Sequence, residues 1–390
     1  YDDYMKQLEG FTASEYDPAY WAELFLAAGA NYAVLTAKHH DGVALFDTKY
    51  TDLNVVKKTP AKRDLVAAYC KAMQNAGIKT GIYFTNTDWS DLDHMRVILD
   101  KPTEEIEKIR KVKSNLVWTS KKYQENDREN PELHAAWKRY KGEITELLTN
   151  YNDVDLVWFD VMLTRDGFSW ESESVKKIIN SLNPKTVVNG RLGEYGDYKT
   201  PELYIPVLPL GEPWEMCTTF NNSWGYQPQD TNYKDIRQIV RMLCECISKG
   251  GNILISIGPK ADGTIPAETE RLMLELGKWN KKYYEAVYPT IQGIGPEYFA
   301  GGSTLSEDRK TLYLFVYDRP YKQIMLNGVK SAVKKITALK NSRDMSFTVT
   351  GGAPWLDMPG CLWINVEEDD LDSVCTVIKV EFDEPIRLVE

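Results

Sequence analysis

The chain has 390 residues, of which 47 are basic and 57 are acidic, so its formal net charge is −10. This acidic balance, without a long lysine or arginine run, argues against nucleic acid as a partner. The apolar runs are far shorter than the roughly 20 residues that cross a bilayer, so no membrane span is expected, and no secretion signal is visible in this chain.

The length exceeds what one hydrophobic core usually fills. It therefore predicts a large domain over residues 1–290 and a smaller domain over residues 291–390. The six cysteines form no CxxC pair, which argues against a zinc site, and we expect them to be buried free thiols. The oligomeric state is left open.

Apolar, β-rich stretches alternate with amphipathic helical patterns through the first 290 residues. The predicted strands cover residues 31–37, 79–85, 154–160, 185–191 and 251–258. The predicted helices cover residues 18–30, 63–77, 131–151, 174–182, 233–251 and 266–288. Gly77 and Gly250 lie at two of the helix ends, where the left-handed conformation that stops a helix favours glycine.

Polar residues gather at the carboxyl ends of the predicted strands, which is typical of a (β/α)8 barrel or an open doubly wound sheet. No GxGxxG motif follows the first strand, and at least four strands end in such residues, which favours the barrel. From about Ile291 the helical period gives way to short alternating segments at residues 310–318, 345–351, 361–367 and 375–383. These segments predict a C-terminal antiparallel β-sandwich.

Asp160 is the first candidate for a reactive side chain, because it ends the apolar stretch DLVWFD and burying a carboxylate without a partner is costly. Trp158 lies two residues earlier and therefore on the same side of the strand. Arg191 ends the next predicted strand, where it could orient the carboxylate. The alternative is a structural role for Asp160, as a helix cap or salt-bridge partner.

A second carboxyl group is needed if Asp160 attacks a glycosidic carbon, because a proton must reach the leaving oxygen. Glu202 and Glu215 are the candidates, since Pro201 and Trp214 beside them could desolvate them and raise their pKa. The alternative for each glutamate is a solvated loop residue without a catalytic role, as most acidic loop residues are.

The adjacent residues His39 and His40 follow the first predicted strand. As metal ligands they would need further partners, and no HExxH pattern supplies them, so no metal site is expected. As neutral rings they could instead hydrogen-bond the hydroxyl groups of a sugar, with Lys38 and Asp41 fixing their tautomers. A structural role in the loop stays open for one of the two.

Eight short motifs follow one another between Tyr20 and Ile265. They are YWAELFLAAGANYAVLTAKHHDG, KRDLV, AGIKTGIYFTNTDW, DLVWFD, VVNGR, WEMC, SWGY and GGNILISIGPKADGTI. In this order they resemble the α-L-fucosidase family of retaining glycoside hydrolases, glycoside hydrolase family 29. The C-terminal sandwich resembles that family's second domain by architecture alone.

The resemblance implies an enzyme that releases terminal α-L-fucose from a fucosylated oligosaccharide or glycoconjugate, without a cofactor, through a catalytic domain over residues 1–290. It implies that Asp160 is the nucleophile and that Glu202, or as second choice Glu215, is the acid/base. The implied substrate-binding residues are His39, His40, Tyr83, Trp158, Arg191 and Trp214. Family habit also favours a periplasmic or extracellular location.

One departure from the family pattern concerns the start of the chain. The family's first barrel strand, which bears His-Trp-Gly, and a following Glu-Trp-Tyr segment would precede Tyr1, and neither motif occurs in this chain. A protein without that strand would lack one wall of the pocket. One alternative is therefore a catalytically weak or inactive fucose-binding protein on the same scaffold. The two adjacent histidines leave a second alternative, a metal-dependent hydrolase that uses His39 and His40.

Overall fold

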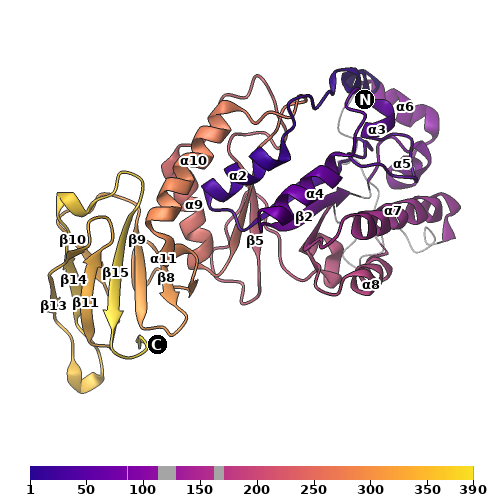
Figure 1. Cartoon of the computed structure of the whole chain (residues 1–390). Coiled ribbons are helices and arrows are strands. Elements are labelled where there is room, and N and C mark those ends of the chain that lie inside the picture. The colour runs from indigo at the N-terminus through magenta and orange to yellow at the C-terminus, as the bar shows by residue number, and fades with distance from the viewer. Residues whose placement is uncertain (86, 113–128, 162–170, 390) are drawn as a thin grey trace. The chain divides into compact units, whose positions relative to one another are not determined.

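The computed structural model describes residues 1–85, 87–112, 129–161 and 171–389 (Figure 1). The chain divides into two compact units. The first unit comprises Tyr1–Leu26, Ala30–Thr200 and Pro259–Pro266, and the second comprises Ala27–Gly29, Pro201–Gly258 and Ala267–Glu390. The predicted domain boundary at residue 290 stays a prediction.

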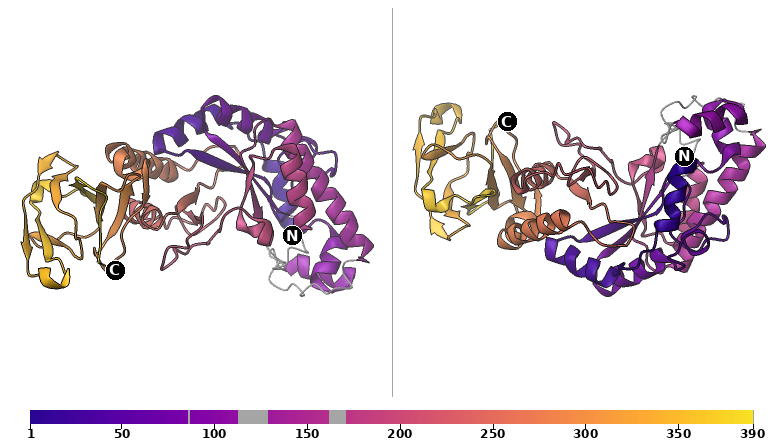
Figure 2. Two further views of the ribbon diagram at one scale, coloured as in Figure 1. Left: turned by 90° about the horizontal axis from the view of Figure 1, so that it is seen from below. Right: turned by 90° about the horizontal axis from the view of Figure 1, so that it is seen from above.

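A four-stranded parallel sheet forms the centre of the first unit. Its strands are, in spatial order, β1 (Tyr32–Lys38), β2 (Lys79–Thr85), β3 (Leu156–Asp160) and β4 (Val187–Val188). Ile82, Phe84 and Phe159 are buried, as expected for the apolar runs that predicted β2 and β3. Figure 2 shows helices of this unit arranged along one face of the sheet.

The helices alternate with these strands, because parallel strands need crossover connections. They are α1 (Asp2–Met5), α2 (Pro18–Ala28), α3 (Val55–Lys58), α4 (Leu65–Asn75), α5 (Leu92–Leu99), α6 (Thr103–Val112), α7 (Pro131–Asn150) and α8 (Ser172–Leu182), with the 3-10 segments η1 (Lys6–Gly10) and η5 (Gly190–Tyr195). Asp64 caps α4 by accepting from the Ala67 amide at 2.8 Å. Gly77, just beyond the same helix, has a φ of +72°, as predicted.

The pairing of β1 with β2 slips by one residue at the carboxyl end of β1. Thr36 pairs with Tyr83, whereas Lys38 pairs with Phe84. Two steps along β1 thus match one step along β2, which is a β-bulge. Because side chains alternate between the faces of a sheet, the bulge places Lys38 on the face of Phe84. The ammonium of Lys38 accordingly lies 5.7 Å from the centre of the Phe84 ring.

The second unit contains a parallel pair of strands, β5 (Glu215–Thr219) and β6 (Asn252–Ser256). Its helices are α9 (Ile236–Ser248), α10 (Ala267–Lys282) and α11 (Tyr284–Val287). Gly250 follows α9 with a φ of +74°, as predicted. The single helix predicted over residues 266–288 is wrong in one respect, because the chain leaves the helix at Tyr283 and α10 and α11 are separate.

Two antiparallel sheets form the rest of this unit. The larger has the order β12 (Arg343–Asp344), β11 (Val333–Ala338), β15 (Thr376–Phe382), β9 (Thr311–Val316), β8 (Gly302–Ser306) and β7 (Thr290–Gln292), and the smaller has the order β10 (Gln323–Leu326), β14 (Cys361–Asn365) and β13 (Phe347–Thr350). The short segments η6 (Pro354–Leu356) and η7 (Glu368–Asp370) are 3-10 helices. Leu314 and Ile378 of the larger sheet share one buried core with Leu326 and Ile364 of the smaller sheet. This confirms an α/β chain with parallel strands and a C-terminal antiparallel part.

Several strands differ from the predicted segments. The strand predicted over residues 185–191 is only the two residues of β4, because the Asn189 side chain takes over the pairing: its Oδ1 accepts from the Phe159 amide at 2.8 Å and its Nδ2 donates to the Phe159 carbonyl at 2.9 Å. Strand β5 was not predicted, and the predicted C-terminal segments do not include β7, β8, β10, β11 and β12. All six cysteines are free thiols, as expected, but only five of them are buried, because Cys361 is partly exposed. Within the described ranges, no helix combines the length and apolarity needed to cross a membrane.

Candidate active site

Side chains from β2 and β3 meet on one face at the carboxyl end of the parallel sheet. Tyr83 pairs in register with Trp158, and Thr85 pairs with Asp160, so all four project from the same face. The Tyr83 and Trp158 rings stack with centres 5.4 Å apart. The apolar rings of this face therefore end at a carboxylate, in keeping with the period-2 pattern of DLVWFD.

Asp160 accepts contacts from four different groups. Its Oδ2 lies 2.5 Å from the Tyr83 hydroxyl and 3.4 Å from His40 Nε2. Its Oδ1 lies 2.9 Å from Arg191 Nη1 and 2.8 Å from the backbone nitrogen of Val161. Charged and neutral donors thus cover both oxygens, which fixes the orientation of the carboxylate.

These donors decide the charge of Asp160. Burial opposes ionisation, but hydrogen bonds from His40 and Tyr83, together with the charge of Arg191, outweigh it and hold the pKa of Asp160 well below its ordinary value. The same carboxylate, after the larger effect of burial, helps to raise the pKa of Tyr83 well above its ordinary value. At neutral pH the site therefore holds an anionic Asp160 beside a protonated Tyr83.

Substituting Tyr83 with phenylalanine is expected to raise the pKa of Asp160. The hydroxyl donates to the ionised carboxylate alone, so its loss disfavours the charged form while the ring and its stacking remain. A carboxyl-carbon NMR titration of wild type and Tyr83→Phe measures the change. An unchanged or lower pKa would show that the Tyr83 hydroxyl does not stabilise the anion.

The backbone turns sharply after Asp160. Val161 has a φ of +55°, in the left-handed region that a β-branched residue seldom occupies. This conformation accompanies the bond from the Val161 amide to Asp160 Oδ1. The prediction that Arg191 ends a strand is wrong, because this residue lies on the 3-10 segment η5. Its guanidinium lies 5.2 Å from the Trp158 ring centre.

The two histidines occupy different positions. His40 is buried, and its Nδ1 lies 2.9 Å from Thr85 Oγ1 while its Nε2 faces Asp160. In a neutral His40 with its proton on Nε2, that proton points to the carboxylate and Nδ1 accepts from Thr85. His39 keeps exposed surface and stacks on Tyr83 with ring centres 5.6 Å apart. Desolvation and the neighbouring His40 lower the pKa of His39 to about 4, so this ring is neutral at pH 7.

His39, His40 and Asp160 form a group that could hold a metal ion, since one ligand atom of each lies within 4.8 Å of the others. Two of the three members are already engaged, because His40 contacts both Thr85 and Asp160. The Arg191 cation beside Asp160 would also repel a dication. The arrangement therefore favours hydrogen bonding over metal binding.

The remaining predicted residues belong to the second unit. Glu202 is exposed, and Glu215 is buried at the start of β5. That either glutamate lies close enough to Asp160 of the first unit to act as its acid/base stays a prediction. Trp214 is buried, and its indole nitrogen donates to the Lys249 carbonyl at 3.2 Å. These are the surroundings of a core side chain, and a role for Trp214 in substrate binding stays a prediction.

Lys38 and Asp41 do not contact the histidine rings in the predicted way. The bulge turns Lys38 to the other face of the sheet, and Asp41 Oδ1 accepts from the Val43 amide at 2.8 Å. Thr85 has the predicted tautomer-fixing role instead. Its position two residues after Tyr83 in the same strand was the signal in the sequence, because that spacing places it on the same face.

Several known proteins with similar sequences are α-L-fucosidases. The α-L-fucosidase family matches residues 1–285 of the chain. The α-L-fucosidase of Branchiostoma floridae is 31% identical and the human plasma α-L-fucosidase 30% identical, each over 294 residues and 72% of this chain. The chain spans 59% and 56% of the length of these two relatives.

Two solved structures share the fold. α-L-Fucosidase isoenzyme 1 from Paenibacillus thiaminolyticus has a TM-score of 0.82 at 31% identity, covering 98% of this chain and 90% of its own. The Thermotoga maritima α-fucosidase, in complex with a mechanism-based inhibitor, has a TM-score of 0.75 at 29% identity, covering 97% of this chain and 82% of its own. With a family match over residues 1–285 that includes every residue around Asp160, the chain belongs to the α-L-fucosidase family.

Proposed function

We propose that this protein is an exo-acting, retaining α-L-fucosidase. The observation that carries the proposal is the anionic Asp160 at the end of β3, held by Tyr83, His40 and Arg191, in a chain of the α-L-fucosidase family. A carboxylate that stays ionised and fixed in orientation is suited to nucleophilic attack on an anomeric carbon. The mechanism-based inhibitor in the Thermotoga maritima relative supports the same reaction class.

The proposed reaction has two displacements. An oxygen of Asp160 forms a bond to the anomeric carbon of fucose while the bond to the leaving oxygen breaks and Glu202 gives that oxygen its proton. Glu202, now a carboxylate, then takes a proton from water, whose oxygen displaces Asp160 and frees fucose with its configuration retained. This sequence requires the two carboxyl groups to lie about 5–5.5 Å apart.

The aromatic and histidine side chains supply the proposed fucose pocket. Tyr83 and Trp158 offer flat apolar surfaces to the sugar ring. His39 is neutral at pH 7, so it can both donate to and accept from sugar hydroxyls. A pocket that pairs with these hydroxyls rejects sugars that cannot return the bonds, because buried polar groups would stay unsatisfied.

We further propose that the parallel strands of both units belong to one (β/α)8-type barrel followed by the C-terminal sandwich. The strand–helix alternation and the polar strand ends of the first unit support this proposal. The proposed substrate is a fucosylated oligosaccharide or glycoconjugate, with no nucleic acid partner. A periplasmic or extracellular location is proposed because it is usual for members of this family.

Covalent trapping tests the proposed function. A 2-fluorinated fucosyl donor with a good leaving group should label the protein once, because fluorine slows both displacements while the good leaving group keeps the first one fast, so the covalent intermediate accumulates. Peptide mapping is expected to place the label on Asp160. A label on another side chain, or none during turnover of an ordinary fucoside, contradicts the nucleophile assignment. Saturable fucose binding without hydrolysis would instead favour the alternative of a binding protein.

The acid/base assignment is tested with Glu202→Ala. Loss of general-acid help is expected to slow hydrolysis of poor leaving groups by about 10²–10⁴-fold, with a much smaller effect on an activated aryl fucoside. Azide should restore turnover by attacking the fucosyl–Asp160 intermediate and giving α-fucosyl azide. The Glu215→Ala variant is the matched comparison, and rescue there alone would move the role to Glu215.

A further inference from the structure

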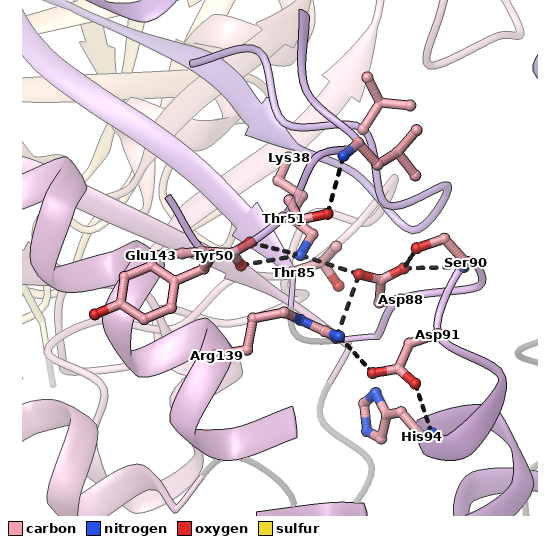
Figure 3. Close-up of polar contacts among 12 residues, drawn as sticks. Lys38, Tyr50, Thr51, Thr85, Asp88, Ser90, Asp91, His94, Arg139 and Glu143 are labelled. Carbon is pink, nitrogen blue, oxygen red and sulfur yellow. Dashed lines mark hydrogen bonds and ion pairs between the residues drawn. The ribbon is translucent and has the colours of Figure 1, made fainter. Parts of the chain in front are cut away.

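Figure 3 shows a cluster of buried charges around Lys38. The strand register places Lys38 on the face of the sheet opposite to Tyr83 and Asp160. Lys38 Nζ lies 2.9 Å from Glu143 of α7 and 3.1 Å from Asp88. Arg139, one turn before Glu143 on α7, lies 3.3 Å from Asp88 and also pairs with Asp91. The side chains of Lys38, Asp88 and Glu143 are at most 3% exposed.

The charges in this cluster depend on one another. Desolvation would lower the pKa of Lys38, but Glu143 and Asp88 outweigh it and raise that pKa. Desolvation would raise the pKa of Asp88, but Lys38 and Arg139 hold it well below its ordinary value. Burying ions costs several kcal/mol each, and apolar residues of similar volume often stabilise a core as well. The cluster therefore calls for a role other than stability.

Two members of the cluster, Lys38 and Asp88, belong to chain segments that contact or contain His40. Lys38 lies two residues before His40, beyond the bulge at the end of β1. Asp88 is followed by Trp89, whose amide donates to the His40 carbonyl at 2.7 Å and whose ring centre lies 5.4 Å from that of His40. Anchoring Lys38 and Asp88 to α7 thus fixes both backbone segments that hold the His40 ring.

We propose that Lys38, Glu143, Asp88 and Arg139 are positioning residues that hold His40 against Asp160. The proposal rests on the proposed function only in that Asp160 is taken as the nucleophile. It gives the bulge a purpose, since without the slip Lys38 would project toward Tyr83 and not toward α7. None of the four residues touches the substrate in this scheme.

The test is the double variant Lys38→Met/Glu143→Met. It removes both charges of the central pair and keeps similar volume, so the protein is expected to fold with a melting temperature near that of wild type. Its kcat on an aryl fucoside is expected to fall about 10- to 100-fold, because small displacements of a site group cost that much, with little change in KM.

A pH profile adds a readout that a merely structural role would not move. Asp160 is faced by His40, Tyr83 and Arg191, with His39 nearby. A loosened His40 withdraws one donor from the anion, so the acidic limb of kcat/KM should move to higher pH. The control is Lys141→Met/Glu171→Met, which removes another ion pair of α7 and should change neither kcat nor the limb.

Histidine spectra make the outcome independent of turnover. The chain has only four histidines, so nitrogen-15 labelled histidine gives a spectrum in which the His40 ring can be assigned. The double variant should change the His40 ring signals and leave those of His134 in place. A folded double variant with wild-type kcat, acidic limb and His40 signals overturns the proposal.

Two further outcomes are distinguishable. If wild type does not hydrolyse fucosides, the proposed function fails, while the His40 signals still decide whether the cluster positions that ring. If the double variant does not fold, Glu143→Gln keeps the size and one acceptor for Lys38. Unchanged His40 signals in Glu143→Gln then overturn the proposal, and a change like that expected of the double variant supports it.

Discussion

Substituting Asp160 with asparagine is expected to lower kcat for fucoside hydrolysis by about 10³-fold or more. The amide keeps the size of the side chain, and its single oxygen can still accept from Arg191, whereas an amide nitrogen in the place of Oδ2 cannot accept from Tyr83. The amide cannot form the ester that divides the proposed reaction into two displacements. Steady-state kinetics with an aryl α-L-fucoside measures the loss, and unchanged circular dichroism and melting show that folding is intact.

The stereochemistry of an azide-rescued reaction shows whether the loss of activity comes from the missing nucleophile or from a general disturbance of the site. In Asp160→Gly, azide can enter the vacated space and displace an activated leaving group in one step. The product is then β-fucosyl azide, with the configuration inverted, whereas rescue at Glu202 gives the α product. Wild-type turnover in Asp160→Asn, or an α product from Asp160→Gly, would remove Asp160 from the nucleophile position.

Substituting Lys38 alone with methionine is expected to lower the free energy of unfolding by about 3–5 kcal/mol. The change leaves Glu143 buried without its cation, and Asp88 retains only Arg139 as a charged partner within the cluster. Such a loss is large against the 5–15 kcal/mol that typical domains have. Urea denaturation of the two proteins at pH 7 measures it.

The matched control for this stability effect lies on the neighbouring strand. Lys79 pairs with Asp155 at 2.9 Å but is mostly exposed, so Lys79→Met should leave stability nearly unchanged. Adding the second substitution, Glu143→Met, should restore much of the free energy of unfolding that Lys38→Met loses, because the buried carboxylate without a cation is then removed. A single Lys38→Met variant as stable as wild type would mean that water or another group reaches the Glu143 carboxylate.

The first three strands could be predicted within one or two residues, because long apolar runs with β-branched residues and polar ends have few other structures open to them. The fourth could not, since its end depends on the Asn189 side chain, which imitates a strand backbone toward Phe159. A side chain that replaces main-chain pairing leaves no periodic trace in the sequence. Arg191 was therefore placed on a strand, although it reaches Asp160 from a 3-10 turn.

The parts of the candidate site that follow from the alternation of side chains along a strand could be predicted. The parts that depend on how neighbouring strands pair could not. Asp160 and Trp158 share one face, and Tyr83 lies beside them, as period-2 spacing requires. Lys38 was placed near the histidines because the bulge at Thr36 cannot be seen in a single sequence. The partner Glu143 lies 105 residues away on α7, a separation that only tertiary structure bridges.

The conformation of Val161 has a consequence for how this protein could be stabilised. A valine in the left-handed region is disfavoured by about 1–3 kcal/mol, and such tension survives only where the surroundings enforce it. Thermostability engineering that searched for relaxed backbones would choose glycine here first. Glycine at position 161 would let the backbone next to Asp160 move more freely. The variant would then gain thermal stability but hold the proposed nucleophile in a less well-defined orientation.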